Sequence, residues 1–185
     1  GNFPVLPLKG ELSRSPNTME GLNPSNTTDR SVAGYYKTTL SSDIICELTV
    51  TSRTGMAKFN YPSGEKTATI VIGSGINATK ISKANVTITS PTSCEGYADG
   101  GSFCGSKTGY TIYFVAEFDQ NAVASGTWEG EKLQATQGTA SGENSGAYFT
   151  FNVSSGRPIQ YKFGVSYVSL ENARKNLKTE NPDFD

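Results

Sequence analysis

Carboxylates and thiols carry whatever reactive chemistry this sequence offers, because it contains no histidine. That absence excludes Ser-His-Asp and Cys-His catalytic arrangements and every histidine-containing metal site. A glycosidase needs two carboxylates held across a sugar from each other. No motif pairs the acidic residues of this chain, of which the candidates are Glu95, Asp99, Glu117, Asp119, Glu129, Glu131 and Glu143. An oxygen-only Ca²⁺ site at Asp99 is disfavoured because its loop holds few acids. We therefore predict no catalytic residues and no metal site in this chain.

Aromatic and polar residues around a glycine-rich segment are the alternative candidates, as contacts to a sugar. The substrate-binding candidates are Tyr97, Asp99, Phe103 and Trp128. Trp128 could stack on a sugar ring, although a lone tryptophan is more often a packed core or rim aromatic. The glycines between positions 96 and 105 precede a predicted strand rather than a helix, which disfavours a phosphate cradle. We interpret them as turn glycines.

Two of the three cysteines flank this glycine-rich segment. Cys94 and Cys104 could close it as a small disulfide, which would contribute about 2–3 kcal/mol in the chain-entropy model. Cys46 shares a strand face with Ile44, Leu48 and Val50, so we interpret it as a small buried hydrophobe. The alternative is three unpaired thiols in a reduced compartment.

Four Asn-x-Ser/Thr triplets bear on the compartment. They begin at Asn26, Asn77, Asn85 and Asn152. Such triplets are candidate N-glycosylation sites and are compatible with secretion, but a chain rich in Asn, Ser and Thr contains several by chance.

Charge and hydropathy exclude two classes of partner. The formal net charge is −1 and the basic residues are scattered, which is unlike a protein that neutralises a phosphate backbone. No stretch reaches the roughly 18 consecutive apolar residues of a membrane helix, and the first residues carry no signal-peptide pattern. We therefore expect neither nucleic-acid binding nor membrane insertion.

Period-two alternation of apolar residues dominates the middle of the chain. The predicted strands are 34–40, 43–52, 56–61, 67–73, 80–90, 110–118, 147–153 and 159–168. The strand at 110–118 is apolar on both faces, which is typical of a central strand covered on both sides. Many strands joined by short polar connections predict a mainly β protein, an antiparallel β-sandwich.

Both ends of the chain depart from this pattern. Residues 1–33 contain four prolines without periodicity, so we predict an extended entry segment followed by a long loop. After a sandwich over residues 34–168, Ser169 can cap one short helix whose apolar face holds Leu170, Ala173 and Leu177. Asn181-Pro182 ends this helix, and residues 169–185 form the third predicted segment, the helix and the start of a linker.

Several segments, in order along nearly the whole chain, resemble the N-terminal domain of glycoside hydrolase family 92. They are Gly1-Asn2-Phe3-Pro4-Val5-Leu6-Pro7, Ala33-Gly34-Tyr35-Tyr36-Lys37, Glu47–Thr51 with Phe59-Asn60-Tyr61-Pro62, Gly101–Gly105 ahead of Tyr113–Phe118, and Lys162–Leu177. The last of these is the most specific. The family usually has a Phe-Ser-His segment where residues 26–32 stand here, so any role of that histidine does not transfer.

The resemblance implies a parent enzyme rather than an enzyme in this chain alone. Family members are Ca²⁺-dependent, inverting exo-α-mannosidases that act on N-glycans or mannans. They join a galactose-mutarotase-like supersandwich to a C-terminal (α/α)6 barrel, which carries the acid, the base and the Ca²⁺ ligands. The resemblance therefore implies a secreted or periplasmic parent, with this chain as an inactive scaffold that lacks a cofactor and contributes substrate-contacting loops.

Two alternatives to this reading are a free-standing carbohydrate-binding module and a structural sandwich of a surface protein. In the leading reading, the upstream strands and the barrel are missing. The expected consequences are unpaired strand edges and an exposed helix face at Leu170, Ala173 and Leu177, which favour self-association.

Overall fold

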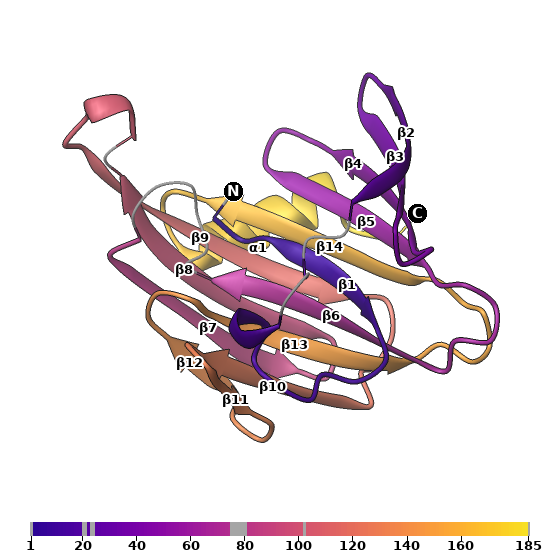
Figure 1. Cartoon of the computed structure of the whole chain (residues 1–185). Helices are drawn as coiled ribbons and strands as arrows, with labels where there is room; N and C mark the ends of the chain where they lie inside the picture. The colour runs from indigo at the N-terminus through magenta and orange to yellow at the C-terminus, as the bar shows by residue number, and fades with distance from the viewer. Residues whose placement is uncertain (1, 20–21, 23–24, 75–80, 102, 185) are drawn as a thin grey trace.

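The computed structural model describes residues 2–19, 22, 25–74, 81–101 and 103–184. Within these residues the strands form two antiparallel sheets that pack face to face, and one helix lies behind the larger sheet (Figure 1). The predicted antiparallel β-sandwich with a short C-terminal helix is confirmed.

The smaller sheet has the strand order β1-β6-β13-β10-β11. Its strands are β1 (Val5–Lys9), β6 (Thr67–Ser74), β13 (Ser145–Asn152), β10 (Ala124–Glu129) and β11 (Lys132–Gln134). β1 joins this sheet as an edge strand, in a segment for which the sequence predicted only an extended backbone. A 3-10 turn, η1 (Pro16–Thr18), follows it.

The larger sheet has the strand order β12-β7-β8-β9-β14-β5-β4-β3-β2. Its strands are β12 (Thr139–Ser141), β7 (Lys83–Ser90), β8 (Ser93–Gly101), β9 (Gly109–Phe118), β14 (Ile159–Ser166), β5 (Thr54–Asn60), β4 (Ile45–Val50), β3 (Tyr35–Leu40) and β2 (Asn26–Val32). A 3-10 turn, η2 (Phe103–Gly105), lies at the tip of the β8–β9 hairpin, which projects beyond the sandwich (Figure 1).

The core lies between the two sheets and is rich in aromatic rings. The ring of Phe118 lies 4.9 Å from that of Phe149, 5.0 Å from that of Phe151 and 5.4 Å from that of Tyr161. All four side chains are at most 3% exposed. These residues alternate with outward-facing ones on β9, β13 and β14, so the period-two pattern places them together.

Strand β9 is covered on both faces, as its sequence predicted. Phe114, Ala116 and Phe118 point into the core between the sheets. Val115, on the opposite face, packs against Ala173 and Leu177 of helix α1 (Leu170–Glu180). The predicted N-cap is also confirmed, because Ser169 Oγ accepts a hydrogen bond from the Asn172 N–H at 3.1 Å.

The expected exposure of the helix face is wrong. Ala173 is fully buried and Leu177 is 2% exposed, because both pack on the outer face of the larger sheet. The Asn176 amide also donates a hydrogen bond to the Val165 carbonyl at 2.8 Å. The helix is therefore an integral layer of this domain and does not offer a free apolar stripe.

The predicted loop across residues 26–32 is also wrong, because this segment is strand β2. All seven of its residues are exposed, so no buried face imposes the apolar alternation that marks a strand. Its order comes from pairing with β3 through a turn in which Gly34 has φ +80°, a value that glycine adopts without strain.

Glycines 96, 100 and 101 lie in strand β8 rather than in a turn. A Cβ atom on Gly96 would lie 2.0 Å from the Asn85 carbonyl oxygen and 2.8 Å from the Phe114 ring. A side chain at position 96 would therefore collide with the neighbouring strand, and close approach of another backbone is one physical reason for a glycine inside a strand.

Candidate functional site

Helix α1 and the chain that follows it border a groove on the outer face of the larger sheet. The groove has a volume of about 480 Å³ and is lined by Thr89, Ser93, Glu95, Val115, Glu117, Lys162, Arg174, Leu177, Lys178 and Pro182. Pro182 follows α1, and the other side chains come from β7, β8, β9, β14 and α1. The lining combines hydroxyls, carboxylates and cations with the apolar side chains of Val115, Leu177 and Pro182. This groove is the candidate site.

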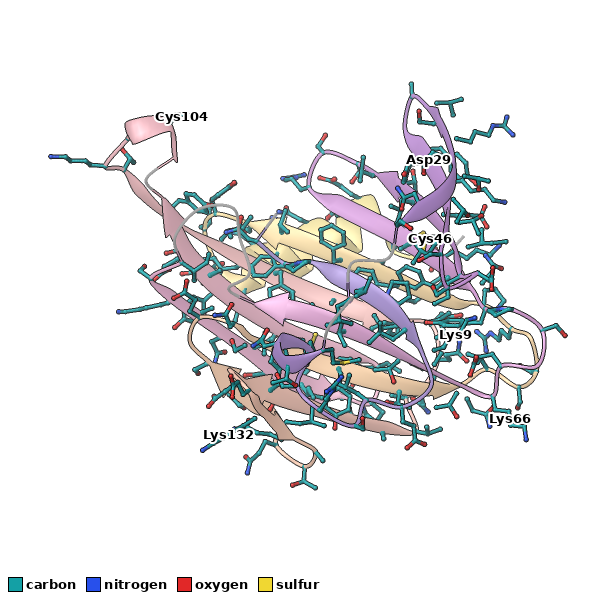
Figure 2. All side chains as sticks on the ribbon, viewed as in Figure 1. Lys9, Asp29, Cys46, Lys66, Cys104 and Lys132 are labelled. Atoms are coloured by element: carbon teal, nitrogen blue, oxygen red, sulfur yellow. The ribbon has the colours of Figure 1, made fainter. Side chains whose placement is uncertain are left out.

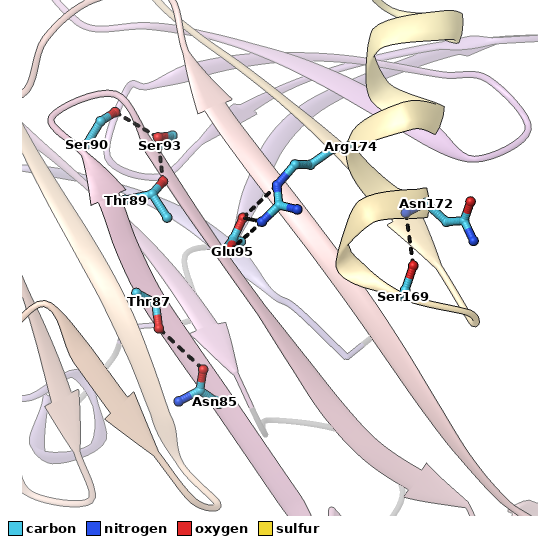
Figure 3. Close-up of polar contacts among 9 residues, drawn as sticks. All are labelled: Asn85, Thr87, Thr89, Ser90, Ser93, Glu95, Ser169, Asn172 and Arg174. Carbon is cyan, nitrogen blue, oxygen red and sulfur yellow. Dashed lines mark hydrogen bonds and ion pairs between the residues drawn. The ribbon is translucent and has the colours of Figure 1, made fainter.

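Glu95 is bound by the helix. The Arg174 guanidinium donates to both of its carboxylate oxygens, with Nη2–Oε1 at 2.6 Å and Nε–Oε2 at 3.1 Å (Figure 3). This fork is the strongest geometry available to an ion pair. Beside it, the Ser93 hydroxyl lies 2.7 Å from those of Thr89 and Ser90.

Glu117, the second carboxylate of the groove, faces a buried lysine. Its Oε2 lies 3.4 Å from Lys162 Nζ, and the Lys162 side chain is only 5% exposed. The same ammonium donates to the carbonyl oxygens of Asn181 at 3.1 Å and Pro182 at 2.7 Å. It also lies 4.5 Å from the centre of the Phe184 ring.

This arrangement binds the two carboxylates to cations and does not set them up as an acid and a base. Ser93 is the register partner of Glu117, so Glu95 and Glu117 are diagonal neighbours on adjacent strands. Each carries a cation in ion-pair distance. No group of three or more His, Cys, Asp or Glu residues that could hold a metal ion occurs within the described part of the chain.

Two of the predicted sugar contacts lie next to this groove. Tyr97 and Asp99 follow Glu95 on the outer face of β8, and both are partly exposed. The Tyr97 ring lies 6.1 Å from that of its register partner Tyr113. Asp99 Oδ1 accepts a hydrogen bond from the Thr111 hydroxyl at 2.6 Å. The result is a small platform of two rings and one oriented carboxylate.

Trp128 does not belong to this platform. It is 1% exposed and packs in a separate cluster with Leu12, Val71 and Tyr148, so its ring has no free face for a sugar. The core interpretation is confirmed and the stacking interpretation is wrong. The Trp128 indole N–H is also without a hydrogen-bond partner in the described structure. The side chain of Phe103 lies outside the described residues.

The proposed Cys94–Cys104 disulfide is absent from the structure. All three cysteines are free, with Cys94 buried in the core and Cys104 exposed at the tip of the projecting hairpin (Figure 2). Strand β8 is extended between them, and its seven steps from Cys94 to Gly101 span roughly 23 Å. A disulfide requires Cα atoms within about 7 Å of each other.

Cys46 is the small buried hydrophobe that its strand position predicted, at 5% exposure. Burial raises the pKa of its thiol to about 11, and burial likewise raises the pKa of Cys94. The thiolate is the reactive form of cysteine, so both residues are inert packing groups.

The glycosylation candidates differ in accessibility. Asn26 and Asn152 are exposed. Asn85 lies on the outer face of β7, where its amide donates to the Ala140 carbonyl at 3.3 Å and the Ser141 hydroxyl at 3.2 Å. Asn77 lies outside the described residues.

The sequence did not identify Arg174, Lys162 and Tyr113 as site residues. The alternation of the 110–118 strand placed Tyr113 on the same face as Val115, which is a usable signal. The pairing of Glu95 with Arg174 joins residues that are 79 positions apart, and no local pattern encodes such a contact.

Comparison with known proteins gives a consistent family assignment. Residues 1–166 match the family model described as "Glycosyl hydrolase family 92 N-terminal domain". No curated protein matches the chain in sequence. No helix in the described residues is long and apolar enough to cross a membrane.

Solved structures share the fold. A family GH92 alpha-mannosidase from Bacteroides thetaiotaomicron aligns with a TM-score of 0.84 at 22% identity, over 98% of this chain and 26% of its own. A family GH92 inverting mannosidase from Bacteroides thetaiotaomicron VPI-5482 gives 0.83 at 22% identity, over 99% and 24%. A further GH92 family glycosyl hydrolase gives 0.87 at 22% identity, over 100% and 26%. The chain thus spans about a quarter of the length of these relatives.

Proposed function

The chain belongs to glycosyl hydrolase family 92 as an N-terminal domain, and from this premise we propose that it is the scaffold of an α-mannosidase and is inactive alone. The observation that carries the proposal is the state of the groove carboxylates. Glu95 is neutralised by Arg174 and Glu117 by Lys162. A glycosidase needs one carboxyl to protonate the leaving group and another to activate water or attack, and neither residue is free for these roles.

The remainder of the parent protein would then supply the catalytic acid and base. We propose that this remainder is the (α/α)6 domain, that it binds the Ca²⁺ ion, and that the substrate is an α-mannoside of N-glycans or mannans. The platform of Tyr97 and Asp99 beside the helix is the part of this chain proposed to contact that substrate. We also propose a secreted or periplasmic parent, which the accessible triplets at Asn26 and Asn152 support.

The first prediction is that the isolated chain does not hydrolyse an aryl α-mannoside, with or without added Ca²⁺. The reason is the absence of a free carboxylate pair in the groove. Release of the aryl group measures the rate, and a full-length family member serves as the positive control. Turnover by this chain at a rate near that of the control would refute the scaffold role.

We also propose weak self-association through strand edges. The smaller sheet ends at β1, in which the backbone N–H and C=O groups of successive residues point alternately toward β6 and toward solvent. The Pro4 carbonyl accepts from the Gly73 N–H and the Gly10 N–H donates to the Thr67 carbonyl, so the even-numbered residues bond to β6. Pro7 therefore faces outward and removes one donor from that edge, which weakens it as a template. The edge strand β2 of the larger sheet contains no proline, and its Val32 is 58% exposed.

The second prediction is therefore that pairing occurs through β2. Light scattering over a wide concentration range should show a rising mean mass. Ser31→Pro in β2 should restore the monomer, because the Ser31 N–H faces away from β3 and proline cannot donate to a ladder. The control is Ser63→Pro, an exposed residue outside both sheets at the first central position of the turn Pro62–Glu65, where proline is favoured. A strict monomer at every concentration would rule out this interface.

A further inference from the structure

A second groove lies on the larger sheet, over β3, β4, β5 and β14. It has a volume of about 430 Å³, and its lining includes Tyr35, Glu47, Met56, Lys58, Gln160 and Phe184. Pro182 lines the first groove and Phe184 lines the second, so the segment that follows α1 borders both.

Strand register places the polar side chains of this groove in one row. Lys58 is the register partner of Glu47 on one side and of Gln160 on the other. On β3 the register partner of Glu47 is Lys37, and Tyr35, which is paired with Thr49, lies diagonal to Glu47. Strands lie about 4.8 Å apart, so β3 and β14 are separated by roughly 14 Å with β4 and β5 between them.

The tail that carries Phe184 is held in place. Lys162 binds the carbonyl oxygens of Asn181 and Pro182 and lies under the Phe184 ring. Just before them, Glu180 accepts hydrogen bonds from Thr51 Oγ1 at 2.5 Å and from the Arg53 N–H at 3.0 Å. The aromatic wall of the groove is thus built into the domain.

Glu47 is oriented but not saturated. Its Oε2 accepts the Tyr35 hydroxyl at 2.6 Å, and its Oε1 accepts the Asn60 amide at 3.2 Å. An ionised carboxylate offers about four acceptor positions, so one position on each oxygen is left for a ligand. The Tyr35 hydrogen bond lowers the pKa of Glu47, and this side chain stays an acceptor.

We propose that this groove binds a neutral pyranose sugar. Adjacent hydroxyls of a pyranose present two donors to one carboxylate, the Lys58 ammonium and the Gln160 amide complement ring and hydroxyl oxygens, and the aromatic side chains accept the C–H face. Lys37 and Lys58, the register partners of Glu47 on β3 and β5, flank the carboxylate, and ammonium groups donate to sugar oxygens while the carboxylate accepts from sugar hydroxyls. The inference does not depend on mannosidase activity, because every group it uses lies in this chain.

The third prediction tests this site by amide chemical-shift mapping. Methyl α-D-mannopyranoside is added to the whole chain to tens of millimolar, and the shifts should cluster at residues 35, 47, 58, 160 and 184. Binding is expected in the millimolar range, as for a shallow site that makes few hydrogen bonds. An absence of shifts, or a cluster centred on Tyr97 and Tyr113, would overturn the assignment.

Glu47→Gln is the decisive variant, because it keeps the shape of the side chain and removes its charge. It should weaken binding about tenfold, as expected for loss of a charge-assisted hydrogen bond. The matched control is Asp29→Asn on edge strand β2 of the same sheet, where the carboxylate accepts the Tyr36 hydroxyl at 2.7 Å outside the groove. Equal affinities for both variants and the wild type would refute the role of Glu47, and amide spectra report whether each variant is folded.

Discussion

Replacing Phe149 with alanine is expected to lower the free energy of unfolding by about 3–5 kcal/mol. Its side chain is fully buried, and its ring contacts Phe118 at 4.9 Å between the centres. Truncation removes the transfer free energy of the ring and leaves a cavity between the sheets that rigid strands cannot close. Since whole domains are stable by about 5–15 kcal/mol, this single change removes a large part of the total.

Urea denaturation followed by circular dichroism measures the effect. The matched control is Val123→Ala, because Val123 is 67% exposed and its change should stay within about 0.5 kcal/mol. A loss below about 1 kcal/mol for Phe149→Ala would mean that this ring is not a central part of the core.

The sandwich could be predicted from the sequence wherever a strand has a buried face. The strand at 110–118 displays apolar residues on both faces, and the structure covers one face with the smaller sheet and the other with α1. The helix could be predicted equally well, because Ser169 is an N-cap residue and Leu170, Ala173 and Leu177 recur at helical spacing.

Strands without that burial pattern escaped prediction for physical reasons. β2 is exposed at every residue, so only its pairing with β3 makes it a strand. β8 contains three glycines whose role depends on the closeness of its neighbours, as Gly96 and the Asn85 carbonyl demonstrate. The strand assignment of β2 and the role of the β8 glycines both depend on which strands become neighbours in the sheet, and the pattern within a single sequence does not determine that.

The candidate site was partly predictable. Tyr97 and Asp99 were identified from residue type, and the structure brings them together on one strand face. Trp128 was a plausible candidate by the same reasoning, but it is buried. The type of a residue indicates which contacts it could make with a sugar, but the packing of the surrounding elements determines whether its side chain is exposed.

Lys162→Met is expected to release the chain after α1 and to lower the free energy of unfolding by about 1–3 kcal/mol. Methionine retains the apolar stem but removes the three donors that bind Asn181, Pro182 and Glu117. The protein loses hydrogen bonds to a charged group that is only 5% exposed, a class worth more than bonds between neutral groups.

The location of the effect distinguishes release of the tail from general destabilisation. Glu180 stays bound to Thr51 and Arg53, which hold the end of the helix independently of Lys162. The NMR order parameters of the Asp183 and Phe184 amides should therefore fall, while those within α1 keep the values of rigid backbone. The matched control is Lys83→Met, an exposed lysine on β7 of the same sheet, which should leave the order parameters unchanged. Order parameters that fall equally across α1 and the tail would contradict a dedicated anchor at Lys162. If the order parameters fall only in the tail, the buried Lys162 ammonium sets the direction in which the chain leaves α1. It then also fixes Pro182 and Phe184, which line the two grooves.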